Sequence, residues 1–161
     1  MNEETKTLAT IIRHQKQVAF LLRELAREFE RRADLHDMSK LQLDELEGFI
    51  QLDSRRQHQK EEYGSKSYEA GISDIGAVKL HVSRNRHHPE YWASRGIEGM
   101  SFVDIIEMLC DWEIARQMRD TEQDINKTWE MRQKRFDLSF DELTFLRGIW
   151  ESIDWQIQTV T

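Results

Sequence analysis

The first part of the chain carries apolar residues at helical spacing. We expect a helix from about Glu3 to Arg32, with one side lined by Ile11, Val18, Leu21, Leu22, Leu25 and Phe29. His14 falls within this stripe, so its ring is expected to face the protein interior. A buried imidazole needs either a hydrogen bond or a metal ion, and the hydrogen bond is the more common outcome.

Further helices follow from the same pattern and from start and stop signals. They are expected from Leu43 to about Glu62, from Ser73 to about His87, from Ser101 to about Arg119, from Thr121 to about Phe136, and from the capping box Ser139–Glu142 onward. Pro89 ends the helix that begins at Ser73, because the residue before a proline is pushed out of the helical region. The segment Tyr63–Ser73 contains glycines and serines and is expected to be an irregular loop, a candidate lid over a pocket.

Composition supports the same class of fold. The 161 residues are 39% hydrophobic and 33% charged, with one proline and seven glycines, which favours helices joined by short loops. A chain of this length can bury one substantial core. The sequence therefore predicts an all-α fold with five or six principal helices in a single domain over residues 1–161.

Charge and hydropathy narrow the class of partner. The net charge of −7 argues against a nucleic-acid polymer as the main partner, while local basic groups could still hold a small phosphate-bearing ligand. No apolar run is long enough to span a membrane, and the single cysteine, Cys110, has no partner for a disulfide within the chain. The residues Met1–Thr7 are polar rather than typical of a signal peptide. We therefore expect a cytoplasmic protein with no membrane partner.

Three groups of residues point to chemistry. The adjacent pair His36-Asp37 places an imidazole and a carboxylate within reach of one metal ion, although for the pair taken alone two solvated residues at a helix start are the better explanation. A second group has the spacing of one helix face if the helix continues far enough: His81, Arg84, Asn85 and His88, with His87 beside them. Such a polar face indicates the wall of a polar pocket, and clustered histidines are typical of transition-metal sites. A solvated face is the alternative.

The third group is acidic. Asp104, Glu107 and Asp111 recur at three- and four-residue steps and so stack on one side of the predicted helix, where like charges repel. A cation beside the carboxylates would explain this arrangement, and a solvated acidic edge is the alternative. Near the end of the chain, Trp150 and Trp155 are expected either to close the core or to form a homodimer contact.

Taken together, these motifs resemble the HD superfamily of metal-dependent phosphohydrolases. The similar segments are His14-Gln15-Lys16, His36-Asp37-Met38-Ser39-Lys40, His81 with Asn85-Arg86-His87-His88-Pro89-Glu90-Tyr91-Trp92, and Glu107-Met108-Leu109-Cys110-Asp111-Trp112. They are closer still to an uncharacterised HD-like family of phage and bacterial proteins. The resemblance spans about residues 10 to 115, and its joint pattern is more specific than any single segment.

The resemblance implies a metal site. His14, His36, Asp37 and Asp111 match the four ligands of a single divalent ion, and mixed imidazole and carboxylate donors suit manganese, iron, cobalt, nickel or zinc better than magnesium. HD phosphodiesterases with two or three metals use further histidines and a lysine after the His-Asp pair, as Lys40 follows here. A second ion held by His81, His87 and His88 is therefore a possibility that the resemblance raises.

The remaining candidates are assigned by chemistry. A metal lowers the pKa of bound water and neutralises charge on phosphoryl oxygens, so hydrolysis needs no covalent intermediate. The expected phosphate contacts are Lys40, Arg84, Asn85 and Arg86. Glu107 or Asp104 is expected to orient the water or to hold a ligating histidine in one tautomer.

Three functions are consistent with this picture. The first is a hydrolase of a small nucleotide, a phosphomonoester or a nucleoside triphosphate, because a compact acidic domain offers little surface to a long polymer. The second is a phosphodiesterase of a cyclic or short oligonucleotide signal, favoured by the extra histidines and Lys40. The third is a non-catalytic helical protein with a structural metal. For a phage-encoded protein, the expected location is the host cytoplasm.

Overall fold

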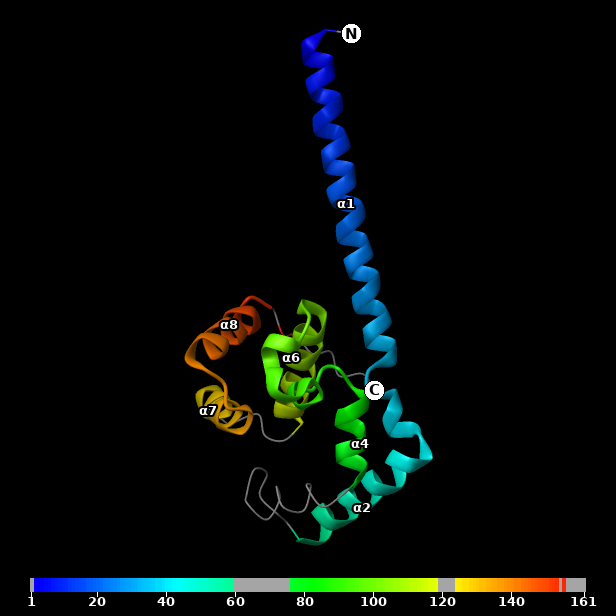
Figure 1. Ribbon diagram of the computed structural model, residues 1–161, viewed down its shortest axis with the longest axis vertical. Coiled ribbons are helices and arrows are strands. Elements are labelled where there is room, and N and C mark those ends of the chain that lie inside the picture. Colours follow the sequence, from blue (N-terminus) through cyan, green and yellow to red (C-terminus); the bar gives the residue numbers. More distant parts are fainter. Residues whose placement is uncertain (1, 60–75, 119–123, 154, 156–161) are drawn as a thin grey trace. The chain divides into compact units, whose positions relative to one another are not determined.

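The computed structural model describes residues 2–59, 76–118, 124–153 and 155, and every element assigned within them is helical (Figure 1). The elements are α1 (Glu3–Leu35), the 3-10 helix η1 (Met38–Leu41), α2 (Leu43–Gln59), α4 (Gly76–Arg84), the 3-10 helix η2 (Pro89–Arg95), α5 (Gly96–Gly99), α6 (Phe102–Gln117), α7 (Ile125–Phe136) and α8 (Phe140–Glu151). The predicted all-α fold is confirmed.

Contacts along the chain define two compact units, residues 1–36 and residues 37–161. Unit 1 contains α1 alone, and unit 2 contains all the other elements. A lone helix has no core of its own. The single domain that the sequence predicts over residues 1–161 therefore stays a prediction.

Unit 1 is one continuous helix of 33 residues. The side chain of Asn2 accepts a hydrogen bond from the Thr5 amide at 2.9 Å, and Glu3 and Glu4 place negative charge in the first turn, where it favours the helix dipole. None of its residues is buried, and His14 is exposed on it; the inward position expected for the His14 ring stays a prediction. Among the described helices, none combines the length and the apolar character needed to cross a membrane.

The main core of unit 2 lies among α5, α6, α7 and α8. Its buried apolar side chains are Ile97, Met100, Ile105, Met108, Leu109, Trp112, Trp129, Leu138 and Leu146. Trp150 packs against this core, and its indole nitrogen donates to Glu113 Oε2 at 3.1 Å. The indole nitrogen of Trp155 donates to the Trp150 carbonyl at 2.7 Å. Both tryptophans pack against the core, and a homodimer contact through them stays a prediction.

A smaller apolar cluster joins α2 to α4. Leu52 and Ala77 are buried there, with Phe49 and Val78 packed against them. This contact holds α2 and α4 side by side, and these two helices supply several of the polar residues of the candidate site. This small cluster thus positions residues of the candidate site and adds little buried apolar area.

The helix ends follow local signals. Ser101 and Ser139 each form a capping box, with Asp104 and Glu142 respectively, as the sequence predicts for Ser139. The helix expected to reach His87 ends at Arg84 instead, so the four predicted polar residues do not share one helix face. The loop Tyr63–Ser73 and the expected helix start at Ser73 lie outside the described residues.

Gly99 permits a close approach between α5 and η2. A Cβ atom at this position would lie 2.9 Å from the Trp92 Cβ and 3.1 Å from the Arg95 Cβ. We expect Gly99→Ala to lower the free energy of unfolding by about 1–3 kcal/mol, because the added methyl group must displace backbone-anchored atoms. Denaturant unfolding measures this change.

Gly148 on α8 provides the matched control, because a Cβ there would meet nothing within 4 Å. Gly148→Ala should be stabilising by roughly 0.5–1 kcal/mol, since alanine is the better helix former. Equal effects of the two substitutions would contradict the close packing at Gly99.

Candidate metal centre

Four side chains of unit 2 bring potential metal ligands together. Asp37, His81, His87 and His88 each offer one atom, and these atoms all lie within 4.8 Å of one another. The Nε2 atoms of His81 and His87 lie 3.1 Å and 3.4 Å from Asp37 Oδ1. We call this set the histidine–aspartate cluster. It brings Asp37, one member of the His-Asp pair, together with the later histidines, which the sequence analysis treated as a separate group.

Local backbone geometry delivers these side chains. Asp37 has a left-handed conformation, with φ of 56°, and precedes η1. His81 lies on α4, while Asn85 follows the end of that helix and donates its side-chain amide to the His81 carbonyl at 2.7 Å. This hydrogen bond satisfies a carbonyl at the helix end and turns the chain. His87 and His88 therefore return toward His81 before Pro89 opens η2.

The cluster is buried and its ring nitrogens need a partner. His81 and His87 are buried, and Asp37 and His88 are half-buried. Within the described residues, the buried Nε2 atom of His88 has no hydrogen-bond partner, and the buried Nε2 atom of His81 faces Asp37 Oδ1 at 3.1 Å. Leaving a buried polar atom unsatisfied costs about 1–3 kcal/mol, and a coordinated cation would remove that cost. The donor set of three imidazoles and one carboxylate suits a divalent transition metal.

Burial also controls the charge of His88. Its pKa is lowered to about 3, chiefly by burial and then by the neighbouring His87 and His81. The ring is therefore neutral near neutral pH and keeps a lone pair available, which is the form in which imidazole binds a metal.

Carboxylates hold the opposite ring nitrogens of two of the histidines. Glu45 Oε2 lies 3.0 Å from His81 Nδ1, and Glu107 Oε1 lies 3.1 Å from His87 Nδ1. A proton on each Nδ1 would be accepted by these carboxylates and would leave Nε2 as the donor atom for a metal. Metal-ligating histidines are commonly oriented in this way. Glu107 was expected either to hold a histidine or to orient water, and it contacts His87.

Glu45 is the residue that sequence reasoning missed. Its side chain is fully buried, and it accepts from the Ser39 hydroxyl at 2.9 Å and from Arg84 at 2.9 Å. In the sequence it is one acidic residue in the first turn of a helix, where acidic residues are common because they favour the helix dipole. Only its burial against His81 reveals a different role.

Arg84 has carboxylate partners in the structure, and its contact with phosphate stays a prediction. It donates to Asp44 Oδ2 at 2.7 Å and to Asp44 Oδ1 at 3.1 Å, besides its contact with Glu45. Hydrogen bonds to Asp44 and Glu45 raise the pKa of Arg84, and its hydrogen bond lowers the pKa of Asp44. The guanidinium thus fixes Glu45, which in turn contacts His81.

Two further predicted site residues support the fold. Arg86 donates to both carboxylate oxygens of Asp104, at 3.3 Å and 3.1 Å, and lies over the Trp92 ring. The hydrogen bond to Asp104 raises the pKa of Arg86. Asp104 is fully buried in the capping box of α6. The geometry gives this pair a structural role, and the phosphate contact of Arg86 and the catalytic role of Asp104 stay predictions.

Asn85 and Lys40 lie at the cluster itself. The Asn85 amide donates to the Ser39 hydroxyl at 2.8 Å, so it supports the group that touches Glu45. Lys40 forms an ion pair with Asp37 Oδ2, and 38% of its side chain is exposed. Lys40 is therefore the basic residue that combines contact with a cluster carboxylate and access from solvent.

The other predicted ligands have different positions. Asp111 is half-buried on α6, one helical turn after Glu107, so the two carboxylates lie on the same side of that helix. His36 caps the end of α1 and is half-buried, and both it and His14 belong to unit 1. Ligation by His14, His36 and Asp111 stays a prediction.

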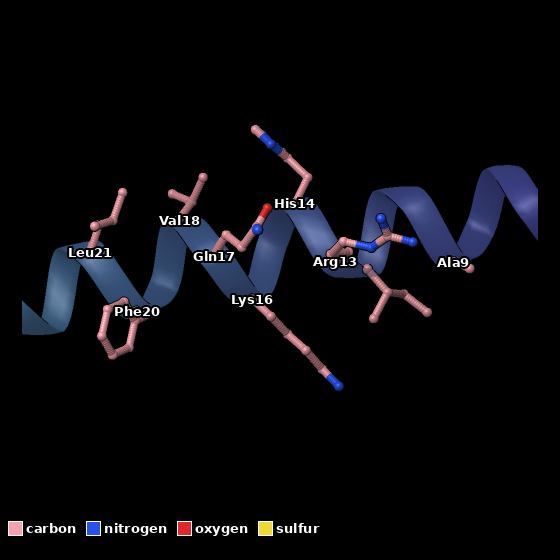
Figure 2. A pocket seen from close by; sticks show the side chains of 9 residues that line it. Ala9, Arg13, His14, Lys16, Gln17, Val18, Phe20 and Leu21 are labelled. Atoms are coloured by element: carbon pink, nitrogen blue, oxygen red, sulfur yellow. The ribbon is translucent and has the colours of Figure 1, made fainter.

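A hollow near His14 does not define a binding site. All nine residues that line it belong to α1, and Figure 2 shows their side chains leaving the helix in different directions. A surface formed by one helix has no opposing wall to enclose a ligand. The candidate site of the described chain is therefore the histidine–aspartate cluster.

Comparison with known proteins places the chain in a family. Residues 3–151 match the model of DUF5662, described as a family of unknown function, and the chain belongs to this family. No curated protein and no solved structure matches the chain. The function proposed for this protein therefore rests on the geometry of the histidine–aspartate cluster.

Proposed function

We propose that this protein is a metal-dependent phosphohydrolase whose metal is held by the histidine–aspartate cluster. The observation that carries the proposal is the pairing of convergent Nε2 atoms with Nδ1 atoms held by buried or half-buried glutamates. Manganese, iron, cobalt, nickel and zinc all suit this donor set. One ion accounts for the cluster. The resemblance to HD proteins raises the expectation of an ion held by His14, His36, Asp37 and Asp111, with the ion at His81, His87 and His88 as the second.

The reaction class follows from the groups beside the cluster. A bound divalent metal supplies a water of lowered pKa and neutralises charge that develops on phosphoryl oxygens. Lys40 lies against Asp37 with part of its side chain exposed, so its ammonium is placed to contact a phosphate oxygen of an incoming substrate. Glu107 holds His87, and Glu45 holds His81, so both imidazoles are oriented before any substrate arrives.

The proposed substrate is a small nucleotide, either a phosphomonoester or a nucleoside triphosphate. The net charge of −7 disfavours a long polyanion, and Arg84 and Arg86 are engaged with carboxylates instead of forming an open basic groove. A short phosphate-bearing ligand needs only the metal and one or two cationic contacts.

Two alternatives have specific support. The three histidines of the cluster, beyond the His-Asp pair, and the neighbouring Lys40 favour a phosphodiesterase of a cyclic or short oligonucleotide. The burial of His81 and His87 instead favours a structural metal in a non-catalytic protein, because structural sites are closed to solvent.

A metal-loading and substrate experiment tests the proposal. The purified chain is stripped with a chelator, reloaded separately with manganese, iron, cobalt, nickel or zinc, and analysed for bound metal. Each form is then incubated with nucleoside mono- and triphosphates, cyclic nucleotides and short oligonucleotides, and the products are separated by chromatography. We expect stoichiometric metal and hydrolysis of a nucleotide phosphate that the chelator abolishes.

The other outcomes are equally informative. Failure to bind any of these metals would falsify the site and the reaction together. Metal binding with cleavage of only cyclic or oligomeric substrates selects the phosphodiesterase, and metal binding without turnover selects the structural metal. Activity that survives complete metal removal contradicts metal-dependent hydrolysis.

A further inference from the structure

A heptad pattern runs along α1. Its positions follow one another at alternating steps of three and four residues, and all but one of them are apolar. They are Leu8, Ile11, Gln15, Val18, Leu22, Leu25 and Phe29. We call these residues the α1 seam. In heptad notation Leu8, Gln15, Leu22 and Phe29 occupy a positions, and the others occupy d positions. A mean step of 3.5 residues is the repeat of helices that supercoil around one another.

The seam is exposed over much of its length. Leu22 is 62% exposed, Ile11 50% and Val18 42%. Water contact along such a row is unfavourable, and long amphipathic helices gain most of their stability by packing an apolar face. The seam therefore indicates a surface made to be covered by another helix.

The partner helix must be long. From Leu8 to Phe29 the seam spans about 33 Å at 1.5 Å per residue. The longest helix described in unit 2 is α2, with 17 residues, which reaches only about 25 Å. Among the described helices, α1 alone, with 33 residues, matches the full seam (Figure 1).

We propose that α1 mediates self-association, with the seams of two copies packed against each other in antiparallel orientation. Small residues flank the seam at Ala19, Ala26 and Ala33, each one position after a d residue, so two helix axes can approach closely.

Charge at the two ends sets the orientation. Continuing the heptad places Glu4 and Arg32 at d positions beyond the apolar stretch. A parallel pair would bring Glu4 beside Glu4 of the other copy, and Arg32 beside Arg32. An antiparallel pair brings the acidic end of one helix to the basic end of the other, which is favourable.

The oligomeric state of the full chain tests the proposal. Sedimentation velocity over a wide concentration range should show a dimer for the wild-type chain. Leu22→Glu places a charge within the seam and should raise the dimer dissociation constant at least about a hundredfold. Phe20→Glu is the matched control, since Phe20 is 57% exposed but lies on the opposite side of α1, and it should leave the dimer intact.

Helical circular dichroism and the fluorescence of the unit 2 tryptophans check that both variants fold. A monomeric wild-type chain, an assembly larger than a dimer, or equal effects of Leu22→Glu and Phe20→Glu would each overturn the pairing through this seam. If Leu22→Glu does not fold, Val18→Glu provides a second test at a d position.

Charge reversal tests the orientation. Glu4→Lys and Arg32→Glu should each weaken an antiparallel dimer by up to about fivefold at low salt, and the double variant should restore the affinity. The helix dipole cannot explain that restoration, because both substitutions oppose the dipole. Equal affinity of the wild type and the single variants, or additive losses in the double variant, would rule out the antiparallel arrangement.

Discussion

Replacement of Asp37 by glycine is expected to abolish tight binding of a divalent transition metal. The carboxylate lies within 3.4 Å of the Nε2 atoms of both His81 and His87, and the substitution removes the anionic member of the donor set. Loss of a direct ligand should exceed the roughly 10–100-fold loss of affinity seen when a partner of a ligand is removed. Hydrolysis should fall to background with the metal.

Glycine is the informative substitution because Asp37 has a φ of 56°. Alanine in the left-handed region adds strain of roughly 1–2 kcal/mol, whereas glycine adopts it freely. Metal content by elemental analysis and affinity by calorimetry measure the effect. Asp141→Ala, at an exposed carboxylate in the first turn of α8, is the control. Unchanged metal affinity in Asp37→Gly, with native helical content, would remove Asp37 from the site.

Replacement of Glu45 should weaken metal binding without removing a ligand. Glu45 fixes the proton of His81 on Nδ1 and is itself fixed by Ser39 and Arg84. We expect Glu45→Gln and Glu45→Ala to lower metal affinity about 10–100-fold, because such outer partners orient the imidazole and raise its basicity. The glutamine variant keeps the shape of the side chain, so it isolates the effect of the charge.

Glu47→Gln serves as the matched control, since Glu47 lies on the same helix but is exposed. Titration of the metal-free variants with cobalt reads out both affinity and ligand geometry, because the visible spectrum of cobalt depends on its coordination. A purely structural role for Glu45 predicts lower stability with an unchanged spectrum and affinity. That result would contradict the positioning role.

The helices were predictable because their signals are local. The capping box at Ser139 and the periodic apolar residues of α1 and α6 specify hydrogen bonds and faces within a few residues of one another. The end of α4 was less accessible: the helix ends at Arg84, three residues before the expected end at His87, and the side chain of Asn85 joins its own backbone amide at the His81 carbonyl. Sequence spacing alone does not reveal that local hydrogen bond.

The candidate site was predictable only in part. His81, His87 and His88 are close in sequence, so their grouping needed no knowledge of the fold. The partners of Arg84 and Arg86 could not be read in the same way. The sequence does not distinguish a free arginine from one that is paired with carboxylates. Asp44 contacts Arg84 and Asp104 contacts Arg86, and each aspartate comes from a separate element.

By itself, the sequence determined the helical class of the fold, the main helix starts and the residue types needed for a metal site, because these depend on local periodicity and on side-chain chemistry. Only the tertiary structure decided that Asp37 meets His81 and His87, and that the buried Glu45 holds His81. Contacts between α2 and α4 create that geometry. Distant residues are brought together by packing, which no short stretch of sequence encodes.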